Sequence, residues 1–521
     1  MTSFRKAPCL RRLAASLSLL ALSGCASAPA APPGDEQQVL LLDEAYSSIS
    51  RYYLDPVSPR ELALAALHNL TSVDASLSIG RQGDFVVLRQ GDQAVRFAAP
   101  GKSDADGWAT LTDRVAGAAR TRSPALATLS VDHLEETLLD GSMSVLDRFS
   151  HYAPPDVAKE RRAERDGFGG IGVTLNTEGP DIRIVEVLPE TPAAEAGLRV
   201  DDRIVAIDGT QVSALNRDDV VRRLRGPADS VVALEIARAG AQAPLAFSMR
   251  RARIVPPSVV LTEAHGIAHL RISSFNQETG DNLADLLHQA HHDLGSGMRG
   301  IILDLRDNPG GLLDQSIEVA SLFLDGEPVS STIGRVPESI QYFTAPHRAV
   351  ETLPLVVLVN GGSASAAEIV ASALQDTGRA VVIGTSSYGK GTVQNVQRMP
   401  NDGELTITWA RLVTPGGYIL HHHGVVPTVC TADLPDDASG IAVALSRSTG
   451  SLAAAFDKPR AKLDDAAWTE LRALCPGAHE DHQVEVETAE KLLGNRALYA
   501  RVLIHAPAAG GVPVATAGVM R

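Results

Sequence analysis

Residues 355–384 read LVVLVNGGSASAAEIVASALQDTGRAVVIG, and this pattern decides the fold class of the chain. The stretch begins and ends in short apolar runs, as expected of strands that are covered on both faces of a sheet. A helix-forming stretch lies between them, and the same alternation occurs upstream. The predicted strands are 301–305, 355–359 and 381–383, and the predicted helices between them are 311–324 and 366–376. This alternation predicts an α/β core, which we place at residues 254–430.

The rest of the chain divides into segments that differ in hydrophobic periodicity and composition. Residues 37–165 show helical spacing, interrupted by a predicted small hairpin at 76–98. Residues 166–253 are predicted to form a compact β-rich module of short alternating runs with one clear helix at 216–225. Residues 431–521 are Ala-rich and are predicted to be helical, with a loose tail. The sequence therefore predicts an α/β multidomain protein.

The composition is that of a globular protein and gives no sign of a nucleic-acid partner. The chain has 521 residues, of which 44% are hydrophobic, and its formal net charge is −15. It contains no basic patch or basic tail, which argues against binding to nucleic acid or to an anionic lipid surface.

Residues 1–24 predict an export signal. A positive segment precedes an apolar stretch that is too short to span a bilayer permanently. The signal runs into the sequence LSGC, which resembles a bacterial lipobox with Cys25 as the lipidated residue, and several acyl chains would give stable anchoring. Ala26 follows, which by the same resemblance favours the periplasmic side of the outer membrane of a Gram-negative bacterium. An ordinary signal peptide is the alternative, and residues 25–36 are small and Pro-rich, as expected of a tether.

Two cysteines, Cys430 and Cys475, would remain in the mature chain if Cys9 leaves with the signal and Cys25 is lipidated. In an oxidising compartment they could form a disulfide. Two buried free thiols are the alternative, and the sequence leaves this choice open.

The turn before the helix at 366–376 contains a candidate nucleophile. Ser365 lies where the helix begins, and the free N–H groups and the positive end of a helix dipole favour an oxyanion there. The N–H of Ala366 is well placed to donate to that oxyanion. Ser363 is the competing candidate, although its ordinary role would be to cap the helix. A serine at a helix start is usually only a cap, so a second observation is needed.

Lys390 provides this second observation. The chain has seven Lys against 40 Arg, and Lys390 is the one lysine between Lys159 and Lys458. Arg cannot act as a base, whereas Lys can once its ammonium group is desolvated. Bringing its pKa near 7 would cost about 4–5 kcal/mol, which burial could supply. A phosphate-binding or surface lysine is the alternative, but no Walker pattern surrounds this residue.

The third element is the sequence DLRDNPGG at residues 304–311, where a predicted strand runs into a Pro-Gly-Gly turn. A backbone N–H freed by this turn could complete an oxyanion hole. A simple strand-to-helix turn is the alternative.

These motifs resemble, in order and spacing, the C-terminal processing (tail-specific) peptidases, which are Ser/Lys-dyad serine proteases of the S41 family. The motifs are DLRDNPGG at 304–311, VNGGSASAAEIVASALQDTGRA at 359–380 and YGKGTVQ at 388–394. The resemblance implies an α/β protease core of the crotonase/ClpP-like type. It implies that Ser365 is the nucleophile, that Lys390 is the general base and that Gln394 orients the lysine.

The same resemblance assigns the oxyanion hole. Its donors would be the N–H of Ala366 and that of one residue of the Gly310–Gly311 pair, of which we favour Gly311. The segment LDRFSHY at residues 146–152 also matches the N-terminal region of the family.

The module at residues 166–253 resembles a PDZ domain. Successive loop N–H groups of such a domain can hold a terminal carboxylate while the peptide adds as a strand. The residues that match the peptide-binding groove are Gly170, Ile171 and Gly172 in the carboxylate-binding loop and Val221 and Leu224 on the helix. The resemblance therefore implies that this module captures apolar C-terminal tails.

Three consecutive histidines, His421 to His423, depart from the family pattern. A metal role is conceivable, but only His421 and His423 would share one face of a strand, and no carboxylate pattern supports it. We therefore expect no metal and no other cofactor.

The sequence as a whole predicts a serine endopeptidase that cleaves exported proteins near their C-termini and is held at the membrane by an N-terminal lipid. Its expected partners are protein substrates with flexible, apolar C-terminal tails, and a homo-oligomer or an adaptor protein is left open. A catalytically inactive PDZ scaffold in the periplasm is the main alternative. A different hydrolase on the same core, such as an esterase, is the second.

Overall fold

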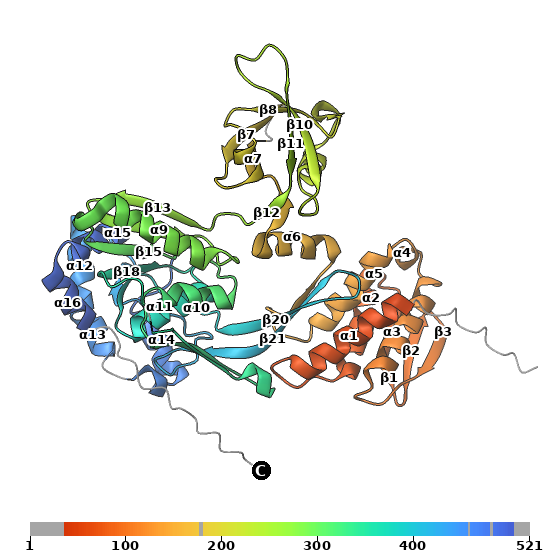
Figure 1. Cartoon of the computed structure of the whole chain (residues 1–521). Coiled ribbons are helices and arrows are strands. Elements are labelled where there is room, and N and C mark those ends of the chain that lie inside the picture. Colours follow the sequence, from red (N-terminus) through yellow and green to blue (C-terminus); the bar gives the residue numbers. More distant parts are fainter. Residues whose placement is uncertain (1–35, 177–180, 348, 457–458, 480–482, 505–521) are drawn as a thin grey trace, which may run out of the picture.

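The computed structural model describes residues 36–176, 181–347, 349–456, 459–479 and 483–504. The predicted signal peptide, the lipidated cysteine and the C-terminal tail lie outside these residues. Figure 1 shows an N-terminal helical region, an α/β core that carries the C-terminal helices, and a β-rich module that stands apart from both. Within the described ranges, no helix has the length and apolar character that a membrane span requires.

The N-terminal region consists of helices that pack around one apolar core. Tyr46 and Trp108 are fully buried in this core. The second helix begins at a capping box, because the Ser58 hydroxyl accepts the Glu61 N–H and the Glu61 carboxylate accepts the Ser58 N–H. The helices are α1 (Glu36–Tyr52), α2 (Pro59–Val73), α3 (Ala105–Arg120), α4 (Pro124–Ala127) and α5 (Val131–Met143).

The segment predicted as a hairpin is a three-stranded antiparallel sheet, so the predicted number of strands was wrong. The sequence Gly-Asp occurs twice in this segment, and each copy turns the chain back on itself. Gly83 and Gly91 both adopt the left-handed φ that such turns need, at 59° and 55°. Leu88 and Phe97 project from the sheet into the helical core. The strands are β1 (Leu77–Gln82), β2 (Phe85–Gln90) and β3 (Gln93–Ala98).

The α/β core contains a six-stranded sheet with helices on both faces. Five neighbouring strands run parallel, and one antiparallel strand lies at the edge. The side chains of Val357 and Val382 pack with those of one helical layer, and Val356 and Val381 pack with the other, as the alternation along a strand requires. In order across the sheet, the strands are β13 (Val259–Ala264), β14 (Ile267–Ile272), β15 (Gly300–Asp304), β18 (Leu355–Val359), β19 (Ala380–Gly384) and β22 (Val429–Cys430).

The two helical layers come from different parts of the chain. The first contains α9 (Thr279–Leu294), α10 (Leu313–Ser321) and α11 (Ala366–Asp376). The second is formed by the C-terminal helices Ala438–Ser448, Gln483–Leu493 and Arg496–Ile504, whereas side chains of the remaining C-terminal helices pack with the first layer. The last part of the chain therefore covers the core rather than forming a separate domain. The C-terminal helices are α12 (Ala438–Ser448), α13 (Ser451–Phe456), α14 (Asp465–Ala473), α15 (Gln483–Leu493) and α16 (Arg496–Ile504).

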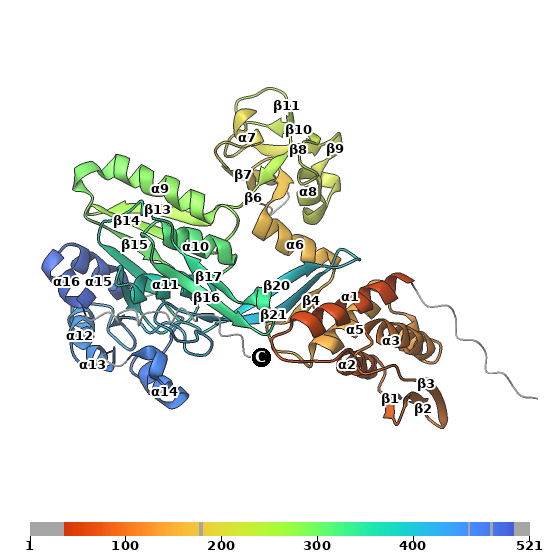
Figure 2. The ribbon, with the colours of Figure 1, turned by 60° about the horizontal axis from the view of Figure 1, so that its bottom comes forward.

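A second sheet connects the core to the N-terminal region (Figure 2). Its strands are β17 (Gln341–Thr344), β16 (Pro328–Gly334), β21 (Glu404–Val413) and β20 (Thr392–Arg398), and the short β4 (His151–Ala153) pairs with β21. Leu405 and Ile407 of β21 are buried in the core of the N-terminal region. This long strand therefore fixes the position of the N-terminal helices relative to the α/β core.

The β-rich module is attached through one helix and one two-stranded ribbon (Figure 1). The helix is α6 (Pro155–Asp166), and the ribbon pairs β5 (Phe168–Gly170) with β12 (Ala252–Ile254). In order across the sheet of the module, the strands are β11 (Leu245–Arg250), β10 (Val231–Ala237), β8 (Arg203–Ile207), β7 (Ile182–Val187) and β6 (Val173–Asn176), with α8 (Arg217–Leu224) packed on it. Strand β6 is therefore at one edge of the sheet.

The two cysteines that the sequence left open are joined in a disulfide. The sulfur atoms of Cys430 and Cys475 are 2.10 Å apart, and 45 positions separate the residues in the sequence. The bond links β22 of the core sheet to the segment that follows α14. The C-terminal region is thus attached covalently to the α/β core.

Candidate active site

Ser365 lies at the junction of β18 and α11 in a strained backbone conformation. Its φ is 55° and its ψ is −115°, a left-handed conformation that costs a non-glycine residue about 1–3 kcal/mol and is found mainly at functional sites. The competing candidate, Ser363, is fully buried, and its hydroxyl donates to the carbonyl of Leu305 at 2.7 Å. Ser363 therefore holds the turn against β15, and Ser365 is the serine that reaches open space.

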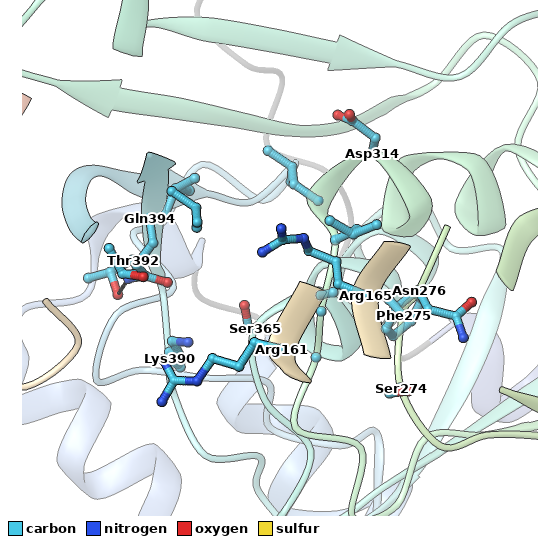
Figure 3. Close-up of a pocket in the computed structure, with 18 of the residues that line it drawn as sticks. Arg161, Arg165, Ser274, Phe275, Asn276, Asp314, Ser365, Lys390, Thr392 and Gln394 are labelled. Carbon is cyan, nitrogen blue, oxygen red and sulfur yellow. Dashed lines mark hydrogen bonds between the residues drawn. The ribbon is translucent and has the colours of Figure 1, made fainter. Parts of the chain in front are cut away.

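A cavity of about 920 Å³ opens beside Ser365 (Figure 3). All six residues that the sequence assigned to catalysis lie in its wall, although they come from three separate parts of the chain. Figure 3 shows the Ser365 hydroxyl and the Lys390 amine directed into this cavity. The six residues are Gly310, Gly311, Ser365, Ala366, Lys390 and Gln394.

Lys390 lies on the loop between β19 and β20, where its side chain is largely withdrawn from water. Burial lowers the pKa of Lys390, and the nearby carboxylates of Glu368 and Asp147 oppose part of this decrease. The amine lies 5.3 Å from the centre of the Phe149 ring. In the described part of the chain, no hydrogen bond joins Lys390 Nζ to Ser365 Oγ or to Gln394. The amine and the hydroxyl therefore share one cavity without being bonded to each other in this structure.

Glu368 connects the loop of the serine with the loop of the lysine, a role that the sequence analysis missed. One carboxylate oxygen accepts the N–H of Ser365 and the N–H of Lys390, both at 2.9 Å. The other accepts the N–H of Gly389 at 2.7 Å and the hydroxyl of Ser387. The side chain is completely buried; burial raises its pKa, and these hydrogen bonds oppose the increase. The spacing Ser-x-x-Glu at a helix start, which is a capping-box pattern, was the signal that could have revealed it.

Two backbone N–H groups beside Ser365 have no acceptor within the described residues. They are those of Ala366, the first residue of α11, and Gly311, whose φ is 146°. The N–H of Gly310, in contrast, donates to the side chain of Asn308 at 2.8 Å. The structure thus leaves Gly311 rather than Gly310 able to serve as an oxyanion donor. A Cβ on Gly310 would lie 2.7 Å from that of Ser365, so only glycine fits there.

Gln394 lies in the cavity wall, but its amide is engaged elsewhere. It donates to the hydroxyl of Thr392 at 2.9 Å and to that of Thr408 at 3.3 Å. The predicted contact with Lys390 is therefore not formed in this structure.

Helix α6 and the segment before it contribute charged side chains of both signs to the wall of the cavity. Arg162 and Arg165 both form ion pairs with Glu404, at 3.1 and 3.2 Å. Arg161 contacts the imidazole of His151, and burial together with the charges of Arg161 and Lys390 lowers the pKa of that histidine. The helix that leads to the β-rich module is thus also part of the candidate active site, which the sequence did not reveal.

The groove residues predicted for the β-rich module lie in that module, outside the cavity wall. The N–H groups of Ile171 and Gly172 donate to no acceptor in the described part of the chain, and Gly172 has a φ of 81°. Leu224 is buried in the core of the module, whereas Val221 is only half-buried. The loop thus offers free N–H groups next to the edge strand β6.

The three histidines lie behind the lysine loop and are not arranged as metal ligands. His423 stacks on Trp468, and the ring of His421 lies edge-on to that of Phe149. Burial and the charge of His422 lower the pKa of His421 to about 4. No group of three His, Cys, Asp or Glu side chains in the described ranges is placed to hold a metal ion.

Comparison with known proteins identifies the family. The family model described as peptidase family S41 matches residues 266–431, and a PDZ-domain model matches residues 183–238. The carboxy-terminal-processing protease of Bartonella bacilliformis is 36% identical over 361 residues, which are 66% of this chain and 83% of that protein. The chain belongs to peptidase family S41.

Other S41 relatives match a smaller part of their own length. The carboxyl-terminal-processing protease of Synechocystis sp. is 37% identical over 263 residues, which are 50% of this chain and 61% of that protein. Among solved structures, a photosystem II D1 C-terminal processing protease has 25% sequence identity and a TM-score of 0.39, with 78% of this chain and 96% of that chain covered. In this S41 peptidase the family match ends at residue 431, so helices α12 to α16 lie beyond it.

Proposed function

We propose that this S41 peptidase is a serine endopeptidase that cleaves exported proteins near their C-termini, with Ser365 as nucleophile and Lys390 as general base. The observation that carries this proposal is the shared cavity. A serine in a strained conformation at a helix start and a lysine whose pKa is lowered by burial both line it, and one buried carboxylate holds their loops together.

The first half of the reaction forms an acyl-enzyme. Neutral Lys390 takes the proton from the Ser365 hydroxyl, and the oxygen attacks the carbonyl carbon of the scissile peptide bond. For this step the amine must move from the Phe149 ring toward Ser365 Oγ. The negative charge on the former carbonyl oxygen is stabilised by the N–H groups of Ala366 and Gly311. Lys390 then returns the proton to the leaving amine.

The second half releases the product through the same groups. Water gives a proton to Lys390 and attacks the ester carbonyl, and the tetrahedral intermediate again faces the two N–H donors. Collapse of the intermediate returns the proton to Ser365 Oγ and frees a new C-terminal carboxylate. Gln394 would orient the lysine once its amide leaves the two threonine hydroxyls.

The PDZ domain is proposed to recruit the substrate. Its edge strand β6 can pair with an extended tail, and the free N–H groups of Ile171 and Gly172 can hold the terminal carboxylate. Gly170, which the sequence placed in the same loop, instead ends strand β5 and pairs with Ala252 of β12. Val221 and Leu224 on α8 would contact the apolar side chains of the tail. We further propose that Cys25 is lipidated and that the enzyme acts on the periplasmic side of the outer membrane.

The decisive experiment compares cleavage and binding of a protein with an apolar C-terminal tail. We expect Ser365→Ala and Lys390→Ala to abolish cleavage while the tail still binds. Matched controls are Ser446→Ala on the surface of α12 and Lys462→Ala, which are both exposed and remote from the cavity. Equal cleavage by wild type and both active-site variants would contradict the proposal. Tail binding without cleavage by the wild type would favour an inactive scaffold, and cleavage of esters alone would favour an esterase.

A further inference from the structure

The segment from Arg472 to Ala478 comprises the end of α14 and the residues after it, and it lies against both loops that hold the candidate catalytic groups. On the lysine side, the Ser386 hydroxyl donates to the carbonyl of Cys475 at 2.5 Å. On the serine side, the N–H of Gly361 donates to the carbonyl of Ala478, also at 2.5 Å. A stretch near the end of the chain is therefore in contact with the loop of the nucleophile and with the loop of the base.

Arg472 makes the central contacts of this segment. Its guanidinium group donates to the carbonyl of Ser387 at 2.9 Å and to that of His423 at 2.5 Å. The hydroxyl of Ser387 in turn donates to Glu368, the carboxylate that accepts the N–H groups of Ser365 and Lys390. Arg472 is thus connected to both catalytic residues through two intervening side chains and backbone groups.

The contact between the segment and the two loops has no free space. A Cβ on Gly361 would lie 2.8 Å from the carbonyl oxygen of Ala478, and a Cβ on Gly477 would lie 2.7 Å from that of Ser386. Such close approach of backbones is possible only for glycine. A displacement of the segment would therefore be transmitted directly to the loops.

The segment is also fixed to the core sheet. Cys475 forms the disulfide with Cys430 in β22, the edge strand next to β19. The loop of Lys390 begins where β19 ends. The disulfide thus holds the segment at the side of the sheet from which the lysine loop emerges.

We propose that residues 472–478 are a positioning element of the catalytic site and that Arg472 is its main positioning residue. The inference rests on the proposed function, since it concerns the placement of Ser365 and Lys390 in that reaction. The inference extends the candidate site to residues 472–478, which lie outside the family match at 266–431. Arg472 is absent from the cavity wall, so it acts on the geometry of the catalytic groups and leaves the binding of substrate to other residues.

The test measures kcat and KM separately for wild type, Arg472→Ala and Arg472→Lys with one tailed protein substrate. We expect Arg472→Ala to lower kcat about 10- to 100-fold, because a displacement of about 1 Å has effects of this size, and to change KM less than about twofold. We expect Arg472→Lys to recover part of kcat, since it can still donate to one carbonyl. Loosening of the lysine loop admits water to Lys390 and raises its pKa, so the rise of the rate with pH should move to higher pH in Arg472→Ala.

The matched control is Arg447→Ala in α12. Arg447 lies in the same C-terminal region and donates to a backbone carbonyl, that of Ala432, at 3.2 Å, but it contacts neither catalytic loop. Its kcat should equal that of the wild type. An equal loss of kcat in Arg447→Ala, or a kcat and pH profile of Arg472→Ala that match the wild type, would overturn the inference.

A folding check and a comparison with Ser365→Ala separate the possible outcomes. If Arg472→Ala does not fold, as judged by its thermal unfolding, the same criteria apply to Arg472→Lys and to Ser386→Ala, which removes the bond to Cys475. If the wild type cleaves and Ser365→Ala does not, normal kcat in all of these variants refutes only the positioning role. If the wild type itself does not cleave, the proposed function fails and this inference fails with it.

Discussion

At the scale of single residues, the most informative side chain is Glu368. A buried carboxylate is costly unless hydrogen bonds satisfy it, and here four donors do so. All four donors belong to the two loops that hold Ser365 and Lys390. The desolvation cost of this carboxylate is therefore offset by contacts that hold the loop of Ser365 and the loop of Lys390 together.

Replacement of this glutamate by glutamine should reduce catalysis more than stability. Glu368→Gln would keep the shape of the side chain, but its NH₂ group would face N–H donors and leave some of them without an acceptor. We expect kcat to fall about 100-fold, because the two loops separate. The measurement is kcat with the thermal midpoint recorded in parallel. The control is Glu487→Gln, an exposed position on α15, and an unchanged kcat in Glu368→Gln would contradict the assigned role.

The pH dependence of the rate should report Lys390. Only the neutral amine can take the proton of Ser365, so the rate should be low in acid and rise as Lys390 loses its proton. Because burial lowers the pKa of Lys390, this rise should be centred below the ordinary pKa of a lysine. A rise centred in the range of an ordinary lysine would show that the side chain is solvated in the active enzyme.

A substitution at Phe149 offers a sharper test of whether Lys390 determines the pH dependence of the rate. The ring face of Phe149 stabilises the charged amine, and Phe149→Leu would remove this attraction while keeping an apolar neighbour. We expect the midpoint of the pH–rate profile to move to lower pH by about half a pH unit, which corresponds to about 0.7 kcal/mol. Phe85→Leu, which removes a ring that lies below Arg96 in the N-terminal sheet, is the control and should leave the profile unchanged.

The sequence pointed to the candidate catalytic residues more directly than to the groups that hold them. Ser365 and Lys390 could be predicted because a helix start and an isolated lysine are local features. Arg472 could not, since its partner Ser387 is 85 positions away in the sequence and nothing local marks the contact. The engagement of Gly310 with Asn308 likewise depends on a turn geometry that composition does not reveal.

At the scale of elements, the PDZ domain makes a prediction about tail binding. Val221→Asp would place a carboxylate where an apolar tail is proposed to lie, and we expect the affinity for such a peptide to fall at least about tenfold, or about 1.4 kcal/mol. The measurement is calorimetry with full-length Ser365→Ala, to prevent cleavage. Val185→Asp, on the exposed surface of β7, is the control and should bind normally. A normal affinity in Val221→Asp would place the groove elsewhere.

Elements were predicted well where a single local signal decides them. The strand 355–359 and the helix 366–376 agree with the structure residue for residue, because a wholly apolar run followed by a Gly-rich turn leaves little choice. The N-terminal sheet was predicted with one strand too few, although its second Gly-Asp turn was visible. The double role of α6, as cavity wall and as connection to the PDZ domain, depends on tertiary packing and could not be read from its sequence.

At the scale of the whole molecule, the anchoring hypothesis leads to a prediction about location. Cys25→Ser would remove the acylated residue, so we expect the protein to move from the membrane fraction to the soluble periplasmic fraction and to lose incorporation of labelled fatty acid. Cys9→Ser, within the predicted signal, is the control and should remain in the membrane fraction. Retention of Cys25→Ser in the membrane fraction would contradict lipidation at this residue.

The attachment of the PDZ domain has a practical consequence for domain exchange. Because the arginines of α6 line the candidate active-site cavity, a chimera that replaces α6 together with the PDZ domain would also replace part of the cavity wall. The natural splice points are Gly167, which ends α6 at a φ of 86°, and the β12 strand of the ribbon. PDZ domains with other tail preferences could be grafted between these points, and α6 and the rest of the cavity wall would stay unchanged.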